Sequence, residues 1–187
     1  MPDPRCDDEL MLAYAGGDVR AFEMLHDRYR QPLYRYLVHA VGDRTLADDL
    51  YQEVWAAIID HRDRFRRKQG FRRYAFRIAH NRVVDHWRRR ARQGQHDSDA
   101  TAGLVDEQAT PERAAERHDR AAALRHALMS LPVEQRSAFL LQQEAGLSLT
   151  DIAERQGVGH ETIKSRLRYA VRKLRERLSP DAQPEPP

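Results

Sequence analysis

The sequence predicts an all-α fold in which two small helical domains are joined by a flexible linker, the second domain containing a helix-turn-helix. Apolar residues recur every three or four positions over residues 8–92 and again over residues 113–178, and strand-like alternation is absent. Residues 93–112 show no periodicity and are rich in Gln, Asp, Ala, Thr and Gly, as is typical of a linker. A chain of 187 residues that is 41% hydrophobic can support two modest cores.

Four helices are expected within residues 8–92, the first domain. Gly16-Gly17-Asp18 separates the first two. Thr45 is the expected N-cap of the third, which carries one apolar residue per turn: Leu46, Leu50, Val54 and Ile58. The fourth is expected from about Phe71 to Arg90, with four residues facing inward: Ala75, Ile78, Ala79 and Val83. We expect these helices to pack together as one domain.

The second domain, residues 113–178, ends in a pattern typical of a helix-turn-helix. Ser148 can cap a helix whose Asp151 sits three residues further on, and Gly157 supplies the turn. The next helix is expected to bury Ile163, Leu167, Val171 and Leu174. Five polar residues then face outward, where they can read a DNA groove or bind phosphate: Glu161, Lys164, Ser165, Arg168 and Arg172. An ordinary helical hairpin with a solvated basic face is the alternative. By composition, residues 179–187 form a disordered tail.

Charge is distributed in blocks, although the formal net charge of the whole chain is only +3. Residues 1–61 carry −6 and residues 93–158 carry −5, whereas residues 62–92 carry +11 and residues 159–178 carry +5. A single basic patch is usually a solvated face, but two that each coincide with a helical pattern indicate two contacts with a polyanion. We therefore expect each domain to contact nucleic acid.

The basic stretch over residues 62–92 is interleaved with aromatic residues: Phe65, Phe71, Tyr74, Phe76 and Trp87. Cations that follow a phosphate backbone, beside rings that stack on unpaired bases, are the combination that binds single-stranded nucleic acid. Phe71 and Phe76 lie where the helix needs inward-facing residues. For any one of these rings, burial in the core is therefore at least as strong an interpretation as stacking on a base. The cations exceed what solubility requires.

Composition excludes several classes of protein. Because Cys6 is the one cysteine, the chain can form neither an internal disulfide nor a thiolate zinc cluster. No stretch approaches the roughly 20 uncharged residues of a membrane span, and the first residues lack the order of a signal peptide. We expect a soluble, cytoplasmic protein with no membrane insertion. No catalytic residues, metal or cofactor are expected, because the sequence shows no nucleophile–base pair and no Gly-rich phosphate loop.

Two other functions are open at this stage. An enzyme is one alternative, because His80, Asp85 and His86 lie at near-helical spacing and could form part of a hydrolase metal site. The positive field of the surrounding arginines opposes a divalent cation there. A stand-alone helix-turn-helix regulator, whose first domain senses a ligand or dimerises, is the other alternative. It leaves the +11 stretch unexplained.

Short motifs occur in both domains. The first domain contains Ala21-Phe22, Tyr29-Arg30, Ala47-Asp48-Asp49-Leu50, Gln52-Glu53-Val54-Trp55, Ile78-Ala79-His80-Asn81 and the run over residues 85–89. The second contains Leu131-Pro132, Arg136, Phe139, Leu147-Ser148, Asp151-Ile152-Ala153 and the run over residues 162–167. Over about residues 8–178 these motifs resemble the extracytoplasmic-function (ECF) sigma factors of bacterial RNA polymerase, which have only regions two and four. The chain departs from the family pattern at Ala75-Phe76, commonly Trp-Leu, and at Glu161, commonly Gly.

The resemblance implies a subunit that binds core RNA polymerase, reads promoter DNA at two elements and opens it. Residues 8–92 would be region two and residues 113–178 region four, with the linker between them running through the polymerase cleft. The resemblance also implies an anti-sigma factor as a partner.

The resemblance assigns roles to three groups of residues. An acidic helix would dock on the largest subunit of polymerase through Asp48, Asp49, Gln52, Glu53 and Trp55. The helix-turn-helix would read the minus-thirty-five element through Glu161, Thr162, Lys164, Ser165, Arg166, Arg168 and Arg172. The basic end of the first domain would bind the minus-ten element through Gln69, Arg73, Asn81, Arg82, Arg88 and Arg89. Beside Gly70, which permits close backbone approach, the Gln69 amide can pair with the edge of an unstacked base.

Overall fold

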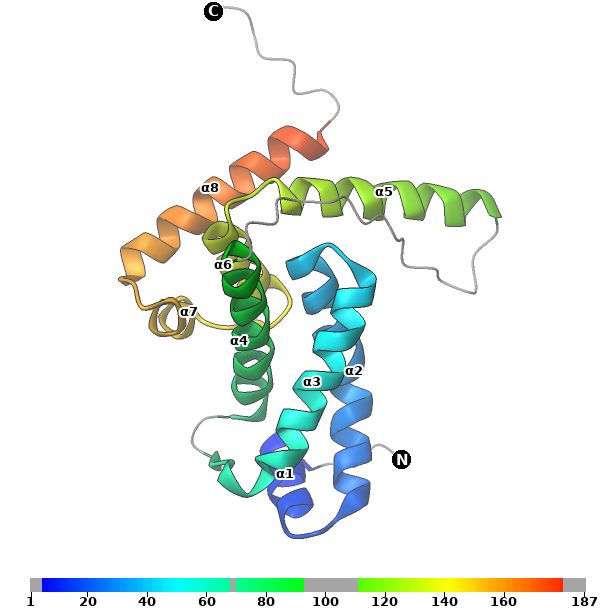
Figure 1. Cartoon of the computed structure of the whole chain (residues 1–187), viewed down its shortest axis with the longest axis vertical. Helices are drawn as coiled ribbons and strands as arrows, with labels where there is room; N and C mark the ends of the chain where they lie inside the picture. The colour runs from blue at the N-terminus through cyan, green and yellow to red at the C-terminus, as the bar shows by residue number, and fades with distance from the viewer. Residues whose placement is uncertain (1–4, 68–69, 93–110, 180–187) are drawn as a thin grey trace, which may run out of the picture.

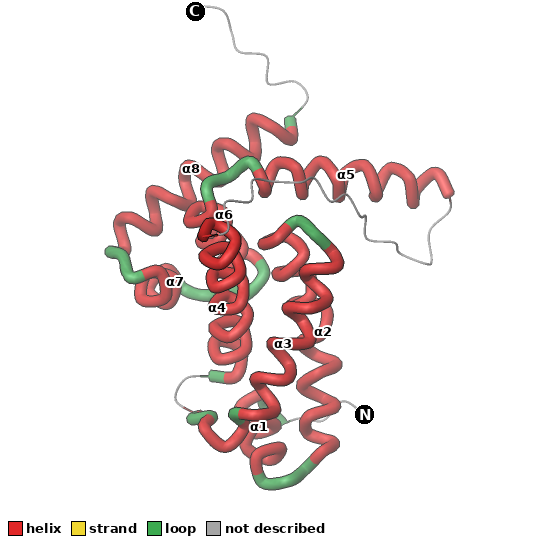
Figure 2. The backbone as a smooth tube through the Cα atoms, in the orientation of Figure 1, coloured by secondary structure: helices red, strands yellow, loops and turns green. Residues whose placement is uncertain are grey.

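The computed structural model describes residues 5–67, 70–92 and 111–179, and within these ranges every regular element is a helix. Figure 1 shows the α-helices in chain order, and Figure 2 shows the described connections between them as short loops. The predicted all-α class is therefore confirmed. Among the described helices, none combines the length and the hydropathy that a membrane span requires.

The first domain is a helical bundle. It consists of α1 (Asp7–Ala15), α2 (Val19–Val41), α3 (Arg44–Asp60), one turn of 3-10 helix (Arg62–Arg64) and α4 (Phe71–Arg92). In Figure 1, α2, α3 and α4 stand side by side, and α1 packs at their lower end. Asp18 caps α2 by accepting a hydrogen bond from the Ala21 amide, and Gly42 ends α2 in the left-handed conformation, with φ at 77°.

The start of α3 corrects one expectation. Asp43, not Thr45, is the N-cap, because its carboxylate accepts a hydrogen bond from the Leu46 amide at 3.2 Å. Both residue types are good caps, but the left-handed turn at Gly42 leaves Asp43 already extended, the conformation that a cap requires. As a result α3 begins at Arg44 and includes Thr45.

Aromatic rings from the basic stretch form part of the core of the first domain. Four of the five are at most 5% exposed: Phe65, Phe71, Tyr74 and Phe76. Phe71, for example, meets Tyr29 edge to face with ring centroids 4.9 Å apart. Trp87 is only partly buried. The core interpretation is therefore correct for four rings, and they are not available to stack on bases. Of the residues predicted to face inward on α4, three are buried and Ile78 is half-buried: Ala75, Ala79 and Val83.

The second domain consists of α5 (Pro111–Met129), α6 (Val133–Gln143), α7 (Leu149–Gln156) and α8 (His160–Leu178). Pro111 lies within the predicted linker, whose residues 93–110 fall outside the described ranges. The helix-turn-helix is present as predicted: Ser148 and Asp151 form a reciprocal capping box at the start of α7, and Gly157 ends it with φ at 64°.

The buried stripe of α8 differs from the prediction at one position. Ile163, Leu167 and Leu174 are buried, but Val171 is 40% exposed and Ala170 takes its place. Positions 163, 167, 170 and 174 follow the helical repeat closely, whereas position 171 lies about 100° further around the helix. The small Ala170 side chain permits close packing of α8 on its neighbours.

The two domains pack against each other. Met129, at the end of α5, lies against Gly42 of the first domain, where even a Cβ atom would come within 2.8 Å of the Met129 sulfur. Glu144, after α6, accepts from Arg35 at 2.5 Å and lies 3.3 Å from His39 Nδ1. In Figure 1, α5 crosses the end of α2, and α6 also packs on α2. Side chains of α6 and α7 reach α4 at two points, Ser137 with His80 and Asp151 with Arg73. The core is therefore continuous across the two domains.

Candidate nucleic-acid interface

The outer face of α8 presents most of the side chains predicted to contact duplex DNA. Ser165 and Arg166 are half-buried, whereas five are exposed: Glu161, Thr162, Lys164, Arg168 and Arg172. The opposite face packs on α5, α6 and α7, so the exposed face is directed into solvent. This is the arrangement by which a recognition helix enters a major groove.

Glu161, the departure from the family pattern, forms an ion pair within α8. Its carboxylate oxygen lies 2.8 Å from Lys164 Nζ. The hydrogen bond from Lys164 holds the pKa of Glu161 below its usual range, so the carboxylate stays ionised. In a complex with DNA the same carboxylate can accept from a cytosine amino group and release Lys164 for phosphate.

Arg166 lies differently from the other predicted DNA contacts. Its guanidinium donates to Gln156 Oε1 at 2.5 Å, and Gln156 Nε2 donates to Ser137 Oγ at 3.1 Å. These hydrogen bonds tie α8 to α7 and α7 to α6. In this arrangement Arg166 stabilises the helix-turn-helix and is not part of the exposed face of α8.

Sequence reasoning missed Tyr169, which is 42% exposed on α8. The guanidinium carbons of Arg172 and Arg168 lie 4.9 and 5.4 Å from the centre of its ring. Such cation–π contacts restrict the two arginines to the surface of the helix. The signal available in the sequence was an aromatic residue with Arg one position before it and three positions after it.

On α4 the residues predicted to bind the minus-ten element do not form one open surface. Arg88 and Arg89 are exposed near the C-terminal end, and Arg88 lies 3.8 Å from Asp85. Arg82 is half-buried, with Nε 3.5 Å from a carboxylate oxygen of Glu53 on α3. Gln69 lies outside the described residues.

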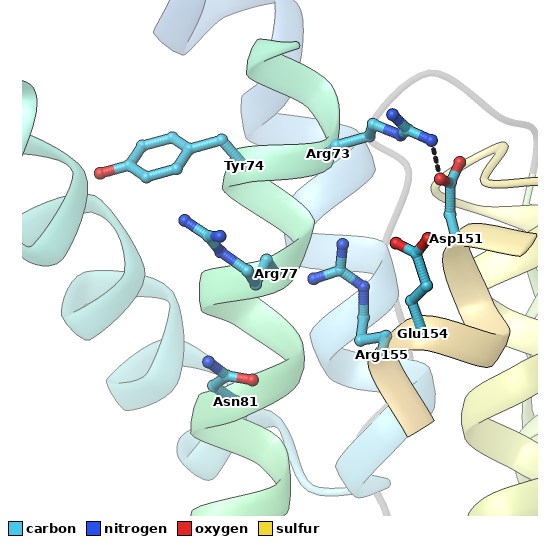
Figure 3. Close-up of a pocket in the computed structure, with 7 residues that line it drawn as sticks. All are labelled: Arg73, Tyr74, Arg77, Asn81, Asp151, Glu154 and Arg155. Carbon is cyan, nitrogen blue, oxygen red and sulfur yellow. Dashed lines mark ion pairs between the residues drawn. The ribbon is translucent and has the colours of Figure 1, made fainter. Parts of the chain in front are cut away.

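Arg73 and Asn81 are exposed, and both border a cavity of about 340 Å³ between α4 and α7. Residues from α4 line one side, and residues from α7 line the other: Arg73, Tyr74, Arg77 and Asn81 against Asp151, Glu154 and Arg155 (Figure 3). Arg73 forms an ion pair with Asp151, the dashed line in Figure 3. An acidic side chain of the second domain therefore neutralises Arg73, an arginine that is predicted to bind DNA phosphate.

The acidic face predicted to bind polymerase is open on α3. Asp48, Asp49, Gln52 and Glu53 are exposed, whereas Trp55 is only 6% exposed. The Trp55 ring packs beneath this face against Phe22, at 5.6 Å between ring centroids, and against His26, at 4.8 Å. Trp55 therefore supports the acidic face from within and is not part of its surface.

A buried histidine joins the two domains. The Nδ1 atom of His80 on α4 lies 3.3 Å from Tyr36 Oη and 3.2 Å from Ser137 Oγ of the second domain. Burial, with a smaller effect of Arg155 and Arg88, lowers the pKa of His80 to about 4, so the ring is neutral at neutral pH. His80 is thus a structural residue. In the part of the chain that the structure describes, no three His, Cys, Asp or Glu side chains are placed to hold a metal ion.

Comparisons with known proteins agree with this architecture. The family model described as Sigma-70 region 2 matches residues 25–93, and the one described as Sigma-70, region 4 matches residues 121–174. The ECF RNA polymerase sigma factor SigM of Mycobacterium tuberculosis is 32% identical over 170 residues, covering 91% of this chain and 83% of the relative. The RNA polymerase sigma-H factor of Pseudomonas aeruginosa is 30% identical over 184 residues, covering 93% and 94%.

Two solved structures share the fold. One is the sigma factor RpoE in complex with the anti-sigma factor NepR from Bartonella quintana, with a TM-score of 0.71, 24% identity and coverage of 86% of this chain and 98% of that one. The other is CnrH in complex with the cytosolic domain of CnrY, with a TM-score of 0.67, 24% identity and coverage of 94% and 99%. At this identity the likeness supports the fold alone.

Proposed function

The chain belongs to the ECF sigma factors of bacterial RNA polymerase, a family of non-enzymatic subunits that recognise DNA, and from this premise we propose that it directs core polymerase to promoters with two elements and helps to open them. The observation that carries the proposal is the pairing of an open basic recognition helix, α8, with a second basic helix, α4, in another domain. This work would take place in the cytoplasm, where polymerase and DNA meet.

The second domain would bind the minus-thirty-five element. Its support is the exposed, cationic face of α8 on a correctly capped helix-turn-helix. We assign base reading to Glu161 and Lys164, which lie near the start of α8, and phosphate binding to Arg168 and Arg172, which Tyr169 restrains. Arg166 contributes by holding α8 in place.

The first domain would bind the minus-ten element and polymerase. Arg88 and Arg89 are exposed and can bind phosphate at once. Arg73 is paired with Asp151 of α7, so its use in DNA binding requires the two domains to separate, whereas Asn81 is exposed in the packed arrangement. We propose that separation accompanies docking of the acidic α3 face on polymerase, which brings region two and region four to distant promoter elements.

We further propose an anti-sigma factor as a partner of this chain. The support is that both solved structures described above are complexes in which a protein of this fold is bound by another chain, named in one as an anti-sigma factor. Such a partner would favour the packed arrangement of the two domains and so oppose polymerase binding.

Transcription with purified core polymerase tests the proposal. Core polymerase with this chain should produce transcripts from discrete start sites on a genomic DNA library, whereas core polymerase alone or the chain alone should not. A matched comparison is the chain with Asp49 and Glu53 changed to Lys, which should fold but support weaker initiation at the same concentration. Start sites that do not depend on the added chain would refute the function.

A further inference from the structure

The cavity between α4 and α7 holds more positive than negative charge. Three guanidinium groups line it, from Arg73, Arg77 and Arg155, against the two carboxylates of Asp151 and Glu154 (Figure 3). The Arg73 and Asp151 side chains neutralise each other in an ion pair. What is left is two arginines and Glu154, which is exposed to solvent.

Arg155 has hydrogen-bond donors that nothing in the described part of the chain satisfies. Its Nε and Nη1 atoms are buried and make no hydrogen bond. A buried charged donor without an acceptor is costly, so a site of this kind favours an added acceptor. Figure 3 shows the side chain extending from α7 toward α4, into the space that Arg77 borders.

Arg77 lies on the opposite wall, on α4. It contacts the face of the Tyr74 ring, with its guanidinium carbon 5.6 Å from the ring centre, and within the described residues it forms no ion pair. The charge of Arg77 acts on Arg155. Burial is the main cause that lowers the pKa of Arg155, and the positive charges of Arg77 and, more weakly, Arg73 lower it further. Two like charges facing a shared cavity are stabilised by an anion between them.

We propose that this cavity binds a free phosphate compound, whose oxygens bridge Arg77 of the first domain and Arg155 of the second. Guanidinium groups present paired N–H donors that match phosphate oxygens, and a dianion neutralises both charges. A cavity of about 340 Å³ is larger than one phosphate group needs, so a diphosphate fits as well.

The position of the two arginines distinguishes a free phosphate compound from DNA. Arg77 and Arg155 belong to different domains, so both reach one ligand only while the domains are packed together. Promoter DNA bound to separated domains would meet Arg77 without Arg155. The bound anion therefore stabilises the packed arrangement, and, if the proposed function is correct, it keeps Arg73 from the promoter.

Titration of pyrophosphate into the full chain, followed by calorimetry at constant ionic strength with chloride as the reference anion, tests the site. We expect saturable binding at one site, weakened about tenfold or more by Arg77→Gln and by Arg155→Gln. Glu154→Gln should tighten binding several-fold, because it removes the competing carboxylate and does not disturb a core residue. Arg30→Gln, which removes one positive charge on an exposed part of α2, is the matched control and should leave binding unchanged.

Three results would overturn the proposal. One is weakening by Arg30→Gln equal to that by Arg155→Gln, which would mean unspecific attraction to a basic protein. The second is an unchanged affinity in Arg77→Gln or in Glu154→Gln, both at exposed positions where the fold should persist. The third is an equal loss of affinity for a single-stranded oligonucleotide in Arg155→Gln and in Arg77→Gln. That result would mean that the site binds DNA phosphate. None of these measurements uses polymerase, so failure here leaves the sigma-factor proposal to its own test.

Discussion

Helices α4 and α8 are both basic and amphipathic, yet they meet solvent in different ways. The outer face of α8 is open along its length, whereas on α4 the Arg73 guanidinium is paired with Asp151 of α7, and Arg88 and Arg89 near the C-terminal end are exposed. The difference does not come from the helices themselves. It comes from the second domain, which contains α8 and also contributes Asp151, the partner of Arg73 on α4. A run of positive charge predicts affinity for a polyanion, but the packing of a distant domain decides whether that charge is available.

The largest effect on stability is expected where buried His80 contacts the second domain through Ser137. The folded pKa of His80 is about 4, below its ordinary value of 6.5, so the unfolded chain takes up a proton first as the pH falls. The stabilisation linked to neutral His80 is therefore fully present above about pH 6.5. It is lost as the pH falls from about 6.5 to 4, which lowers the free energy of unfolding by up to about 3 kcal/mol. Urea unfolding across this range measures the loss.

Two variants sharpen that test. His80→Gln should flatten the dependence of the free energy of unfolding on pH between 6.5 and 4. His160→Gln, at an exposed position on α8, should leave the dependence as it is in the parent chain. If His80→Gln retains the full slope, the titrating group lies elsewhere and His80 does not cause the loss of stability.

The open helix should show the next largest effect. We expect Lys164→Ala and Arg168→Ala each to weaken binding of duplex DNA by the second domain. Loss of a side chain that reads a base should also lower the sequence preference at one base pair by about 1–3 kcal/mol. Binding to a library of duplexes, measured with the full chain, separates loss of affinity from loss of sequence preference. Val171→Ala, exposed on the same helix but apolar, is the control. Unchanged duplex binding in both the arginine and the lysine variant would show that α8 does not read DNA.

The acidic face of α3 allows a prediction for the first domain alone. Asp49→Lys with Glu53→Lys should lower affinity for core polymerase about tenfold, since charge reversal opposes a basic partner. Loss of Glu53 also frees Arg82, whose Nε lies 3.5 Å from its carboxylate, so DNA binding should not fall. Co-purification with polymerase measures the effect, and circular dichroism checks the fold. Normal polymerase binding by a folded variant would remove α3 from the interface.

The smallest effect is expected at the free end of α4. Changing Arg88 and Arg89 to Gln should reduce the slope of log affinity against log salt by about one for each phosphate that the variant no longer binds, without altering sequence preference. Binding of a minus-ten oligonucleotide at several salt concentrations measures the slope. An unchanged slope would place these two arginines away from the phosphate backbone.

Local signals predicted much of the fold. The capping box at Ser148 and the turn at Gly157 depend on neighbours in the chain, and both are in place. The errors were small and local: Asp43 caps α3 in place of Thr45, and Ala170 is buried in place of Val171. The ion pair of Arg73 with Asp151 could not be predicted, because it depends on how two separate domains meet.

The candidate site was predicted less completely than the fold. Residue type and helical spacing identified the exposed cations of α8 but not the inward turn of Arg166, which depends on the position of Gln156 in another helix. The family resemblance assigned Trp55 to the polymerase surface, yet its large ring is buried against Phe22 and His26. Side-chain direction is a property of the packed structure.

The central claim is that the second domain holds Arg73, a predicted promoter contact on α4, in an ion pair with Asp151 in the free protein. The most direct measurement compares Arg73→Ala with Arg168→Ala for DNA binding by the free chain and by the chain assembled with core polymerase. We predict that Arg168→Ala weakens DNA binding in both states, whereas Arg73→Ala weakens it only after assembly. An equal loss for Arg73→Ala in the free chain would contradict the claim, because it would show that Arg73 already binds DNA while the domains are packed.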